Sequence, residues 1–290
     1  MQAMRNNALP ATDAATVIGH LAMHALLDEA RLAPKPGLVD SRGSGAHADL
    51  DLALMCRSAR ALEPAFIAMA EAGQGAGASS LALRETLGRL GRDAEATMMR
   101  ATGGINTHRG AIWALGLLAA AAASEGPAAG AACIAATAAA IARLPDRAAP
   151  LRTGHKGEQA CRDYGVSGAR GQAQAGFPQV MRIALPALHT SRARGDSETA
   201  ARLNALLAII ATLDDTCVLS RGGPAALRRL QCGAGAVLAA GGAATFEGRR
   251  RLRELDAEAL ASNASPGGAA DLLAATLFLD SFTGTPHGKA

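Results

Sequence analysis

The chain has few of the residues that stack on bases or build sheets. Only 2% of its 290 residues are aromatic, with one Trp and one Tyr. Proteins that bind single-stranded nucleic acid stack bases on aromatic rings, so this scarcity, with a formal charge of only +4, argues against a nucleic-acid partner. Six Val and nine Ile are too few for a sheet protein, whereas Ala and Leu are abundant. The composition therefore predicts an all-α fold.

Paired cysteines and a secretion signal are also missing. The five cysteines are scattered, odd in number and free of C-x-x-C spacing, which argues against a disulfide framework or a zinc site. The first ten residues are polar and contain no apolar core of the kind that a signal peptide needs. We therefore expect reduced thiols and a cytoplasmic location.

No uninterrupted apolar run is long enough to span a membrane. From Gly110 to Ala142 the only charged residue is Glu125, but alanine supplies most of the apolarity, and Glu125-Gly126-Pro127 divides the stretch. Each half is shorter than the roughly 20 residues that a helix needs to cross a bilayer. The pattern predicts a buried helical hairpin at the centre of a bundle, and no membrane partner.

What the sequence does contain is helical periodicity, divided by breaks rich in Gly and Pro. No linker composition separates two parts, so we expect a single large multi-helical bundle over 1–290, with 1–10 as a flexible tail. The expected helices cover residues 12–31, 49–71, 80–100, 110–142 as a hairpin, 157–164, 179–189, 197–219, 246–262 and 270–282. Function should lie in the breaks between them.

The first break, Pro34 to His47, is too rich in Pro and Gly for a helix or a regular strand. Glycines such as Gly37 let backbone N–H groups turn toward an anion, and basic side chains add charge. A solvated turn stiffened by proline is an equally good interpretation. The residues of interest in and around this break are Glu29, Lys35, Asp40, Arg42, His47 and Asp49.

The second break opens a long helix at Gly110. The unpaired N–H groups and the dipole of a helix N-terminus attract an anion, and His108 and Arg109 would lie beside it. The alternative is that Asn106 or Thr107 merely caps the helix, and the two interpretations are compatible.

The third break joins carboxylates, an arginine and repeated glycine. Glu158 precedes the string Gly168-Ala169-Arg170-Gly171. Glycine inside a helix is destabilising, so its repetition indicates close approach of the backbone to a ligand or to another helix. Helix packing alone is the alternative explanation.

The fourth break contains two adjacent acids, Asp214 and Asp215, which we place at the C-terminal end of the 197–219 helix. Acids there oppose the helix dipole, and a bound Mg²⁺ would offset that cost. A solvated helix end is the alternative. In the last break, Ser265 and Asp271 are expected to be helix caps and nothing more.

Common nucleotide and hydrolase motifs do not occur. The sequence has no G-x-x-x-x-G-K-[ST], no G-x-G-x-x-G between strand and helix, no G-x-S-x-G and no H-E-x-x-H. The residues taken by themselves therefore predict an anion site between helices, with a metal as an option.

A series of short strings carries a family resemblance over almost the whole chain. They are Pro34-Lys35-Pro36-Gly37-Leu38-Val39-Asp40, Gly45-Ala46-His47-x-Asp49, Asn106-Thr107-His108-Arg109-Gly110, Gly168-Ala169-Arg170-Gly171, Gly176-Phe177-Pro178, Asp215-Thr216, Arg221-Gly222-Gly223 and Ser265-Pro266-Gly267-Gly268-x-x-Asp271-Leu272-Leu273. In this order they resemble the triphosphoribosyl-dephospho-CoA synthase family, which serves citrate lyase and malonate decarboxylase. Gln172 and Cys217 depart from the pattern, and this favours the malonate decarboxylase branch.

The resemblance implies an all-helical transferase that joins ATP to 3′-dephospho-CoA and releases adenine. Its product, 2′-(5″-triphosphoribosyl)-3′-dephospho-CoA, is the precursor of an acyl carrier protein's prosthetic group and would pass to an acyl carrier protein transferase. The ribose 2′-hydroxyl displaces adenine through a transition state with oxocarbenium character, which carboxylates, an acid and a base would assist. The retained triphosphate would be held by Mg²⁺ and cationic side chains.

On this resemblance we predict three groups of site residues, in a chain that is compatible with a homo-oligomer. The catalytic group is Glu29, His47, Asp49, His108 and Glu158. The ATP-binding group is Lys35, Gly37, Arg109, Arg170 and Arg221. The metal ligands are Asp40 and Asp215.

Two other functions stay open. A helical, Mg²⁺-dependent hydrolase of ADP-ribose-like N-glycosides would use water in place of the ribose hydroxyl, so its adenine release would not depend on dephospho-CoA. A non-catalytic scaffold for an acyl carrier protein would show no heat of binding with ATP and Mg²⁺. The transferase hypothesis requires that the distant breaks converge on one pocket.

Overall fold

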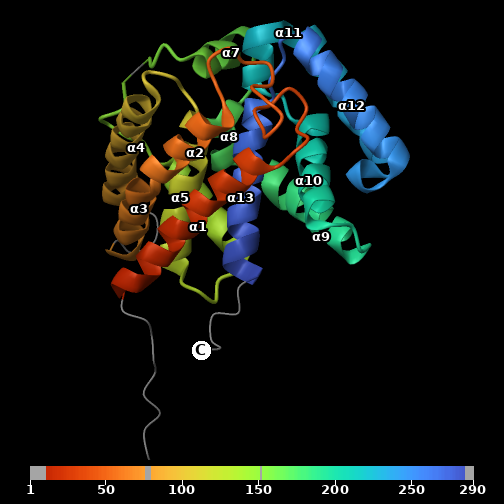
Figure 1. The fold of residues 1–290 in the computed structure, drawn as a ribbon. Helices are drawn as coiled ribbons and strands as arrows, with labels where there is room; N and C mark the ends of the chain where they lie inside the picture. Colours follow the sequence, from red (N-terminus) through yellow and green to blue (C-terminus); the bar gives the residue numbers. More distant parts are fainter. Residues whose placement is uncertain (1–10, 76–79, 151, 285–290) are drawn as a thin grey trace, which may run out of the picture.

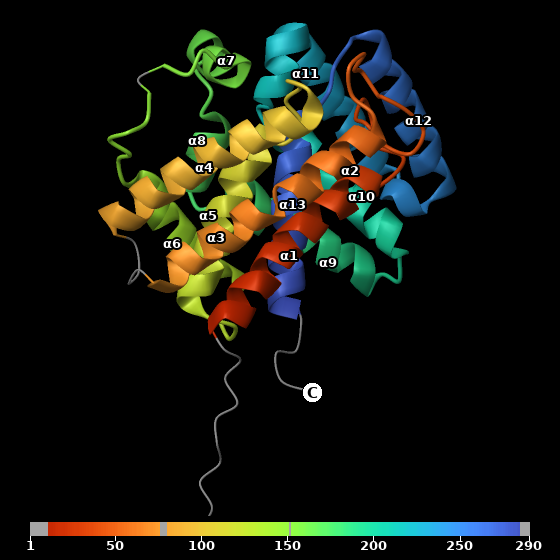
Figure 2. The same ribbon diagram turned by 60° about the vertical axis from the view of Figure 1, so that its left-hand side comes forward.

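The protein, examined as a computed structural model, is described over residues 11–75, 80–150 and 152–284, and the regular elements in these ranges are all helices (Figures 1 and 2). The prediction of an all-α fold is confirmed. The expected flexible tail, residues 1–10, lies outside the described residues. One apolar core cluster includes side chains from Ala15 to Phe282, and the assignment of the chain to a single domain stays a prediction.

The helices follow one another without a long irregular insertion apart from the loop after the first. They are α1 (Ala11–Arg31), α2 (Leu52–Ala61), α3 (Glu63–Gly75), α4 (Leu81–Thr102), α5 (Arg109–Glu125), α6 (Ala131–Arg143), α7 (Lys156–Tyr164), α8 (Gly168–Gln174), the π-helix η1 (Gln179–Ala184), α9 (Leu185–Ala193), α10 (Glu198–Thr212), α11 (Thr216–Ala239), the 3₁₀-helix η2 (Gly242–Ala244), α12 (Phe246–Ala261) and α13 (Gly267–Gly284).

The centre of the bundle is α5, which contacts α1, α3, α4, α6 and α13. Its residues from Ala114 to Ala122 are buried, and most of them are alanine. Small side chains let neighbours approach closely: a Cβ added at Gly73 of α3 would lie 2.1 Å from the carbonyl oxygen of Ala120. With α6 this helix forms the predicted buried hairpin. Taken singly, no helix in the described ranges is long and apolar enough to cross a membrane, and only the bent pair of α10 and α11 passes that test.

Two predicted helices are each divided in the structure. The predicted 49–71 helix breaks at Leu62, because Pro64 in the first turn of α3 has no N–H group to continue the hydrogen-bond ladder. The predicted 197–219 helix ends at Thr212, and α11 starts again at Thr216 with its axis turned by 62°. The boundary drawn at Leu219 was therefore wrong.

This second division moves Asp215 from a helix end to a helix start. Asp215 is the N-cap of α11, where a carboxylate satisfies free N–H groups and the helix dipole favours its charge. We had placed it at a C-terminus, where its charge would need Mg²⁺. That placement was wrong, and the argument for a metal that depended on it no longer holds.

The loops named as candidate sites gather at one end of the bundle. In Figures 1 and 2 the C-terminal end of α1 and the N-terminal ends of α5, α11 and α13 lie toward the upper end. The first turn of α1 and the last turn of α13 lie at the opposite end. Residues that are up to 240 positions apart in the chain can therefore meet, as the transferase hypothesis requires.

Candidate active site

The loop after α1 is built around a buried lysine. Lys35 Nζ donates to the carbonyl oxygen of Glu29 at 2.7 Å and to its Oε1 at 2.5 Å. The two side chains are only 1% and 4% exposed. Buried charges of this kind are tolerated when they are paired. The ion pair therefore fixes the Lys35 side chain against Glu29, which lies on the last turn of α1.

Asp40 arranges the rest of this loop. Its carboxylate accepts hydrogen bonds from the Lys35 N–H (2.8 Å), from the Arg42 N–H (2.8 Å) and from the Arg42 guanidinium (2.7 Å). Burial opposes the charge, but these bonds outweigh it and hold the pKa of Asp40 below its ordinary value. Both carboxylate oxygens are thus occupied by protein donors, so the residue as it stands does not fit a metal ligand.

Gly37 joins this loop to the C-terminal part of the chain. It has a left-handed backbone (φ 68°), and a Cβ there would lie 2.3 Å from the carbonyl oxygen of Ala264. Its N–H donates to Asp256 of α12 at 3.0 Å, and Arg42 binds the same carboxylate at 2.5 Å. The Gly37 N–H group is therefore used within the fold rather than offered to an anion.

His47 and Arg221 form a second contact between this loop and α11. Arg221 Nη1 lies 3.1 Å from His47 Nδ1, and the Ser265 hydroxyl lies 2.9 Å from His47 Nε2. Arg221 Nη1 also lies 3.3 Å from His47 Nε2, and since arginine can only donate, the ring accepts from it. Burial, together with the charge of Arg221, lowers the pKa of His47. Asp49, 3.8 Å from this ring, is 63% exposed.

His108 lies buried at the start of α5. Its Nδ1 contacts the Ser58 hydroxyl at 3.0 Å, and Ser58 in turn contacts Thr107 at 2.6 Å. Its Nε2 is buried and has no hydrogen-bond partner among the described residues. Burial, with a smaller contribution from the charge of Lys35, lowers the pKa of His108 to about 3, so the ring is neutral.

Asp215 joins the starts of α11 and α13. Its Oδ1 accepts from the Cys217 N–H at 2.8 Å, and its Oδ2 accepts from the Ala269 N–H at 2.9 Å. The side chain is nearly fully buried, and burial raises its pKa in spite of these bonds. Like Asp40, it has no oxygen clearly free for a metal ion.

Asp271, on the first turns of α13, is the residue that we had expected to be a cap and nothing more. Its carboxylate accepts a hydrogen bond from the Ala111 N–H at the start of α5. Burial raises its pKa well above the ordinary value, and the charges of Glu29 and Asp215 add to this effect. The residue stood in one of the family strings, but no periodicity in the sequence showed that it would face α1 and α11.

The structure thus brings five of these side chains together where α1, α5, α11 and α13 meet. We call this cluster the junction: Glu29, Lys35, His108, Asp215 and Asp271. His47 and Arg221 lie beside it through Ser265, which stands two residues before the start of α13. Four of the predicted breaks therefore contribute to one site.

Besides Gly37, Asp40, His47, Asp49 and Arg221, described above, three more predicted residues lie outside the junction. Arg109 points toward α4, where its Nε donates to Glu95 at 3.0 Å. Glu158 on α7 is held by Thr153 and Arg162, chiefly by the Thr153 hydroxyl, and its pKa falls to about 2, so it is a weak base near neutral pH. Arg170 on α8 is exposed.

α7 and α8 nevertheless flank the start of α11. A Cβ at Gly157 would lie 3.7 Å from the Thr216 hydroxyl, and one at Gly168 would lie 3.5 Å from the Thr216 methyl group. The third break therefore contributes helix ends next to the junction, as its glycines indicated. Helix packing and proximity to the site both explain them.

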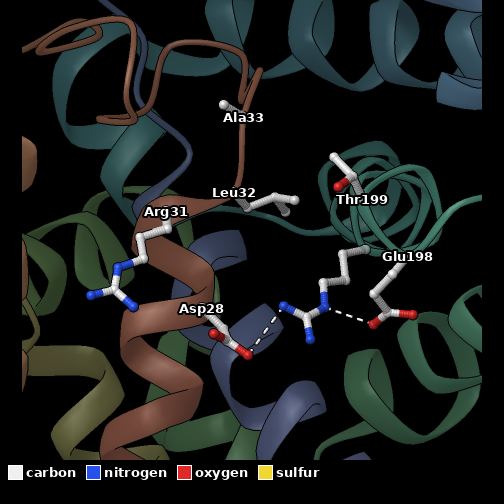
Figure 3. A pocket seen from close by; sticks show the side chains of 7 residues that line it. Asp28, Arg31, Leu32, Ala33, Glu198 and Thr199 are labelled. Carbon is white, nitrogen blue, oxygen red and sulfur yellow. Dashed lines mark hydrogen bonds and ion pairs between the residues drawn. The ribbon is translucent and has the colours of Figure 1, made fainter.

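The described residues do not form an evident metal centre or a deep cavity at the junction. Across the described ranges, no group of three or more His, Cys, Asp or Glu side chains is arranged to hold a metal ion. A cleft of about 250 Å³ lies nearby, between the end of α1 and the start of α10 (Figure 3). It is lined by Asp28, Arg31, Leu32, Ala33, Glu198, Thr199 and Arg202, none of which is a predicted site residue.

Comparison with known proteins gives one consistent result. The model of the family described as ATP:dephospho-CoA triphosphoribosyl transferase matches residues 15–288. A Klebsiella pneumoniae protein named 2-(5″-triphosphoribosyl)-3′-dephosphocoenzyme-A synthase is 61% identical over 267 residues, which are 92% of this chain and 95% of that protein. A Stutzerimonas stutzeri (strain A1501) protein assigned as the same synthase is 62% identical over 274 residues, 94% of each chain.

The fold is also found in a solved structure. A crystal structure from Archaeoglobus fulgidus, assigned as a triphosphoribosyl-dephospho-CoA synthase, covers 78% of this chain and 98% of its own, with a TM-score of 0.52 and 22% identity. At that identity the likeness supports the helical fold alone. The high-identity relatives support the resemblance drawn from the short strings.

Proposed function

Because this chain belongs to the ATP:dephospho-CoA triphosphoribosyl transferase family, we propose that its junction joins ATP to 3′-dephospho-CoA and releases adenine. The observation that carries this proposal is 61% identity to a protein named as the synthase, over 92% of the chain. The five junction residues all lie inside the matched range 15–288. Close relatives at this identity share fold and chemistry when the site residues stand within the aligned part.

The reaction exchanges one bond for another at C1 of the ATP ribose. The C1–N9 bond to adenine breaks, and a bond forms from C1 to the 2′-oxygen of dephospho-CoA. Adenine gains a proton and the hydroxyl loses one. Carbon C1 carries positive character in the transition state, and carboxylates of the junction such as Glu29 and Asp215 would stabilise it.

The triphosphate stays on the product, so it is a handle rather than a leaving group. We propose that Arg170 and Arg221 hold it, since both are exposed and belong to helices that meet at Thr216. Mg²⁺ would enter as its ATP complex and neutralise phosphate charge, because Asp40 and Asp215 are occupied by protein donors. Lys35 would act through its charge, since its ammonium group already binds Glu29.

We further propose a cytoplasmic enzyme of the malonate decarboxylase branch, whose product passes to an acyl carrier protein transferase. The choice of branch rests on the departures of Gln172 and Cys217 from the family pattern. Cys217, the residue after Thr216, contacts Gly267 beside the junction.

The test is adenine release from ATP and Mg²⁺, with and without 3′-dephospho-CoA. The proposal expects release only when both substrates are present, together with a product whose mass equals their sum less adenine. Release without dephospho-CoA would support the N-glycoside hydrolase instead. No release and no heat of ATP binding would support the scaffold.

A matched pair of variants tests the triphosphate handle. Arg221→Gln should raise the KM for ATP about tenfold or more, because a charge-assisted contact is lost. Arg228→Gln, an exposed arginine on the same helix, should leave the KM within about twofold. If both changes raised the KM for ATP equally, Arg221 would not be a contact of the triphosphate.

A further inference from the structure

Three carboxylates and one ammonium group share the junction. The charges of Glu29 and Asp215 both act on Asp271, while Lys35 is the cation that pairs with Glu29. Three like charges this close cannot all persist in a buried site unless each is compensated. Burial and like charge therefore favour the protonated form of a carboxyl group at this cluster.

The hydrogen-bond donors show which carboxyl group holds it. Glu29 has the full charge of Lys35 at 2.5 Å. Asp215 accepts from the Cys217 N–H at 2.8 Å, from Val218 at 3.4 Å and from Ala269 at 2.9 Å. Asp271 receives a hydrogen bond from one group in the described ranges, the Ala111 N–H. The charged form is least stabilised at Asp271, whose pKa is raised well above its ordinary value by burial and by the charges of Glu29 and Asp215.

Asp271 also differs from Glu29 and Asp215 in its exposure to solvent. Glu29 and Asp215 are each 3% exposed, whereas Asp271 is half-buried. Its carboxylate lies directly on the backbone of α5, because a Cβ added at Gly110 would be 2.1 Å from Asp271 Oδ2. The junction thus has two carboxylate residues that are almost fully buried and a third, Asp271, that is partly exposed.

A second observation indicates that the junction faces a ligand. His108 is 2% exposed, and its Nε2 has no hydrogen-bond partner among residues 11–75, 80–150 and 152–284. The ring is close enough to Lys35 for that charge to act on it. A buried ring nitrogen left unpaired beside a charged cluster is expected where a substrate atom completes the bonding.

We propose that Asp271 is the general acid of the transfer and delivers its proton to adenine as the C1–N9 bond breaks. This inference rests on the proposed function. The bonding electrons go to the adenine ring, the Asp271 proton goes to a ring nitrogen, and the dephospho-CoA hydroxyl releases its proton to solvent as C1–O forms. Asp271 then regains a proton from solvent, so the turnover balances.

The titratable groups that interact with Asp271 directly are Glu29 on α1 and, at the start of α11, Asp215 and Cys217. Behind them, Lys35 pairs with Glu29, His108 lies near Lys35, and Arg221 acts on Cys217. Only Lys35 and Arg221 carry positive charge, and each is already bound to another residue. The rate with ATP should therefore fall as alkaline pH removes the proton from Asp271.

The test compares Asp271→Asn with the wild type on two donors. With ATP, kcat should fall by about 10²–10⁴-fold, the usual contribution of a general acid. With 4-nitrophenyl riboside 5′-triphosphate, whose leaving group needs no proton, the loss should be less than about tenfold. Asp280→Asn, on the same helix but bound to Arg192 and His189, is the control and should keep both rates within about twofold.

The possible outcomes separate this inference from the proposed function. If the wild type releases no adenine from ATP and dephospho-CoA, the function fails. If it does, and Asp271→Asn slows both donors equally or neither, the acid role is overturned. Should the variant not fold, the wild-type pH profile decides: the alkaline fall in kcat must appear with ATP and vanish with the nitrophenyl donor, and identical profiles would refute the proposal.

Discussion

Two adjacent acids at the end of α1 face opposite environments. Glu29 turns into the junction and binds Lys35, with both side chains no more than 4% exposed. Asp28 turns into the cleft of Figure 3 and binds Arg202 at 3.1 Å, with exposures of 42% and 26%. The same kind of ion pair therefore occurs twice at the end of α1, once buried and once exposed to solvent.

The difference between the two pairs lies in solvation. In the cleft, water screens the charges, so a lost partner is replaced by solvent. In the junction a lost partner leaves a charge buried and uncompensated. Changes to the charges of the cleft should therefore have little effect on stability, whereas changes to those of the junction should have a large one.

The largest expected effect comes from breaking the buried pair. Lys35→Met should lower the free energy of unfolding by about 3–5 kcal/mol, because Glu29 is left charged and buried. Urea denaturation at pH 7 measures the change. The double variant Lys35→Met/Glu29→Met should recover most of the loss, since an apolar pair of similar volume removes the buried charge. A double variant as unstable as the single one would show that packing, and not charge, decides this site.

The next effect concerns catalysis more than stability. Gly110→Ala places a Cβ 2.1 Å from Asp271 Oδ2, so the carboxylate must move. We expect adenine release to fall by about 10²-fold, since a displacement of about 1 Å in a catalytic group has that effect. Gly91→Ala on α4 is the control, because its Cβ would meet nothing within 4 Å. It should leave the rate unchanged and stabilise the helix by up to about 1 kcal/mol.

The sequence predicted the helices well and their ends less well. The central hairpin followed from an alanine run with one interruption, and α5 and α6 confirm it. The break between α10 and α11 was missed because the apolar pattern runs through it. The helix ends at Thr212 and Asp215 caps the start of the next one, so the missed break put Asp215 at the wrong kind of helix end.

The site, like the helix ends, could be predicted only in part from the sequence. The strings around Lys35, His108 and Asp215 marked segments that do meet. Single residues within them could not be ranked, since burial and donor count decide their roles. Asp271 was expected to be a helix cap, because acids are common at caps, whereas in the structure its carboxylate accepts from the Ala111 N–H. The predicted catalytic role of Glu158 stays a prediction, and its carboxylate is bonded by Thr153.

A smaller effect is expected on the pH dependence of stability, and it distinguishes the junction from ordinary core packing. His108 is neutral in the fold, with a pKa of about 3, but in the unfolded chain it takes up a proton below its ordinary value near 6.5. The unfolded state thus binds more protons between these values, and stability falls as the pH drops through this window, by about 1.4 kcal/mol per pH unit. Urea midpoints at pH 7 and 5.5 should therefore differ more in the wild type than in His108→Gln. Parallel shifts would contradict the buried neutral ring.

The smallest effect is expected on the far side of α1, in the cleft. Arg202 binds Asp28 at 3.1 Å and Glu198 at 2.7 Å, but its side chain is 26% exposed, and Glu198 keeps Arg192 as a second partner. Arg202→Ala should therefore lower the free energy of unfolding by less than about 1 kcal/mol, with adenine release unchanged. A loss as large as that of Lys35→Met would erase the contrast between the two faces. A loss of activity without a loss of stability would mean that the cleft, and not the junction alone, binds a substrate.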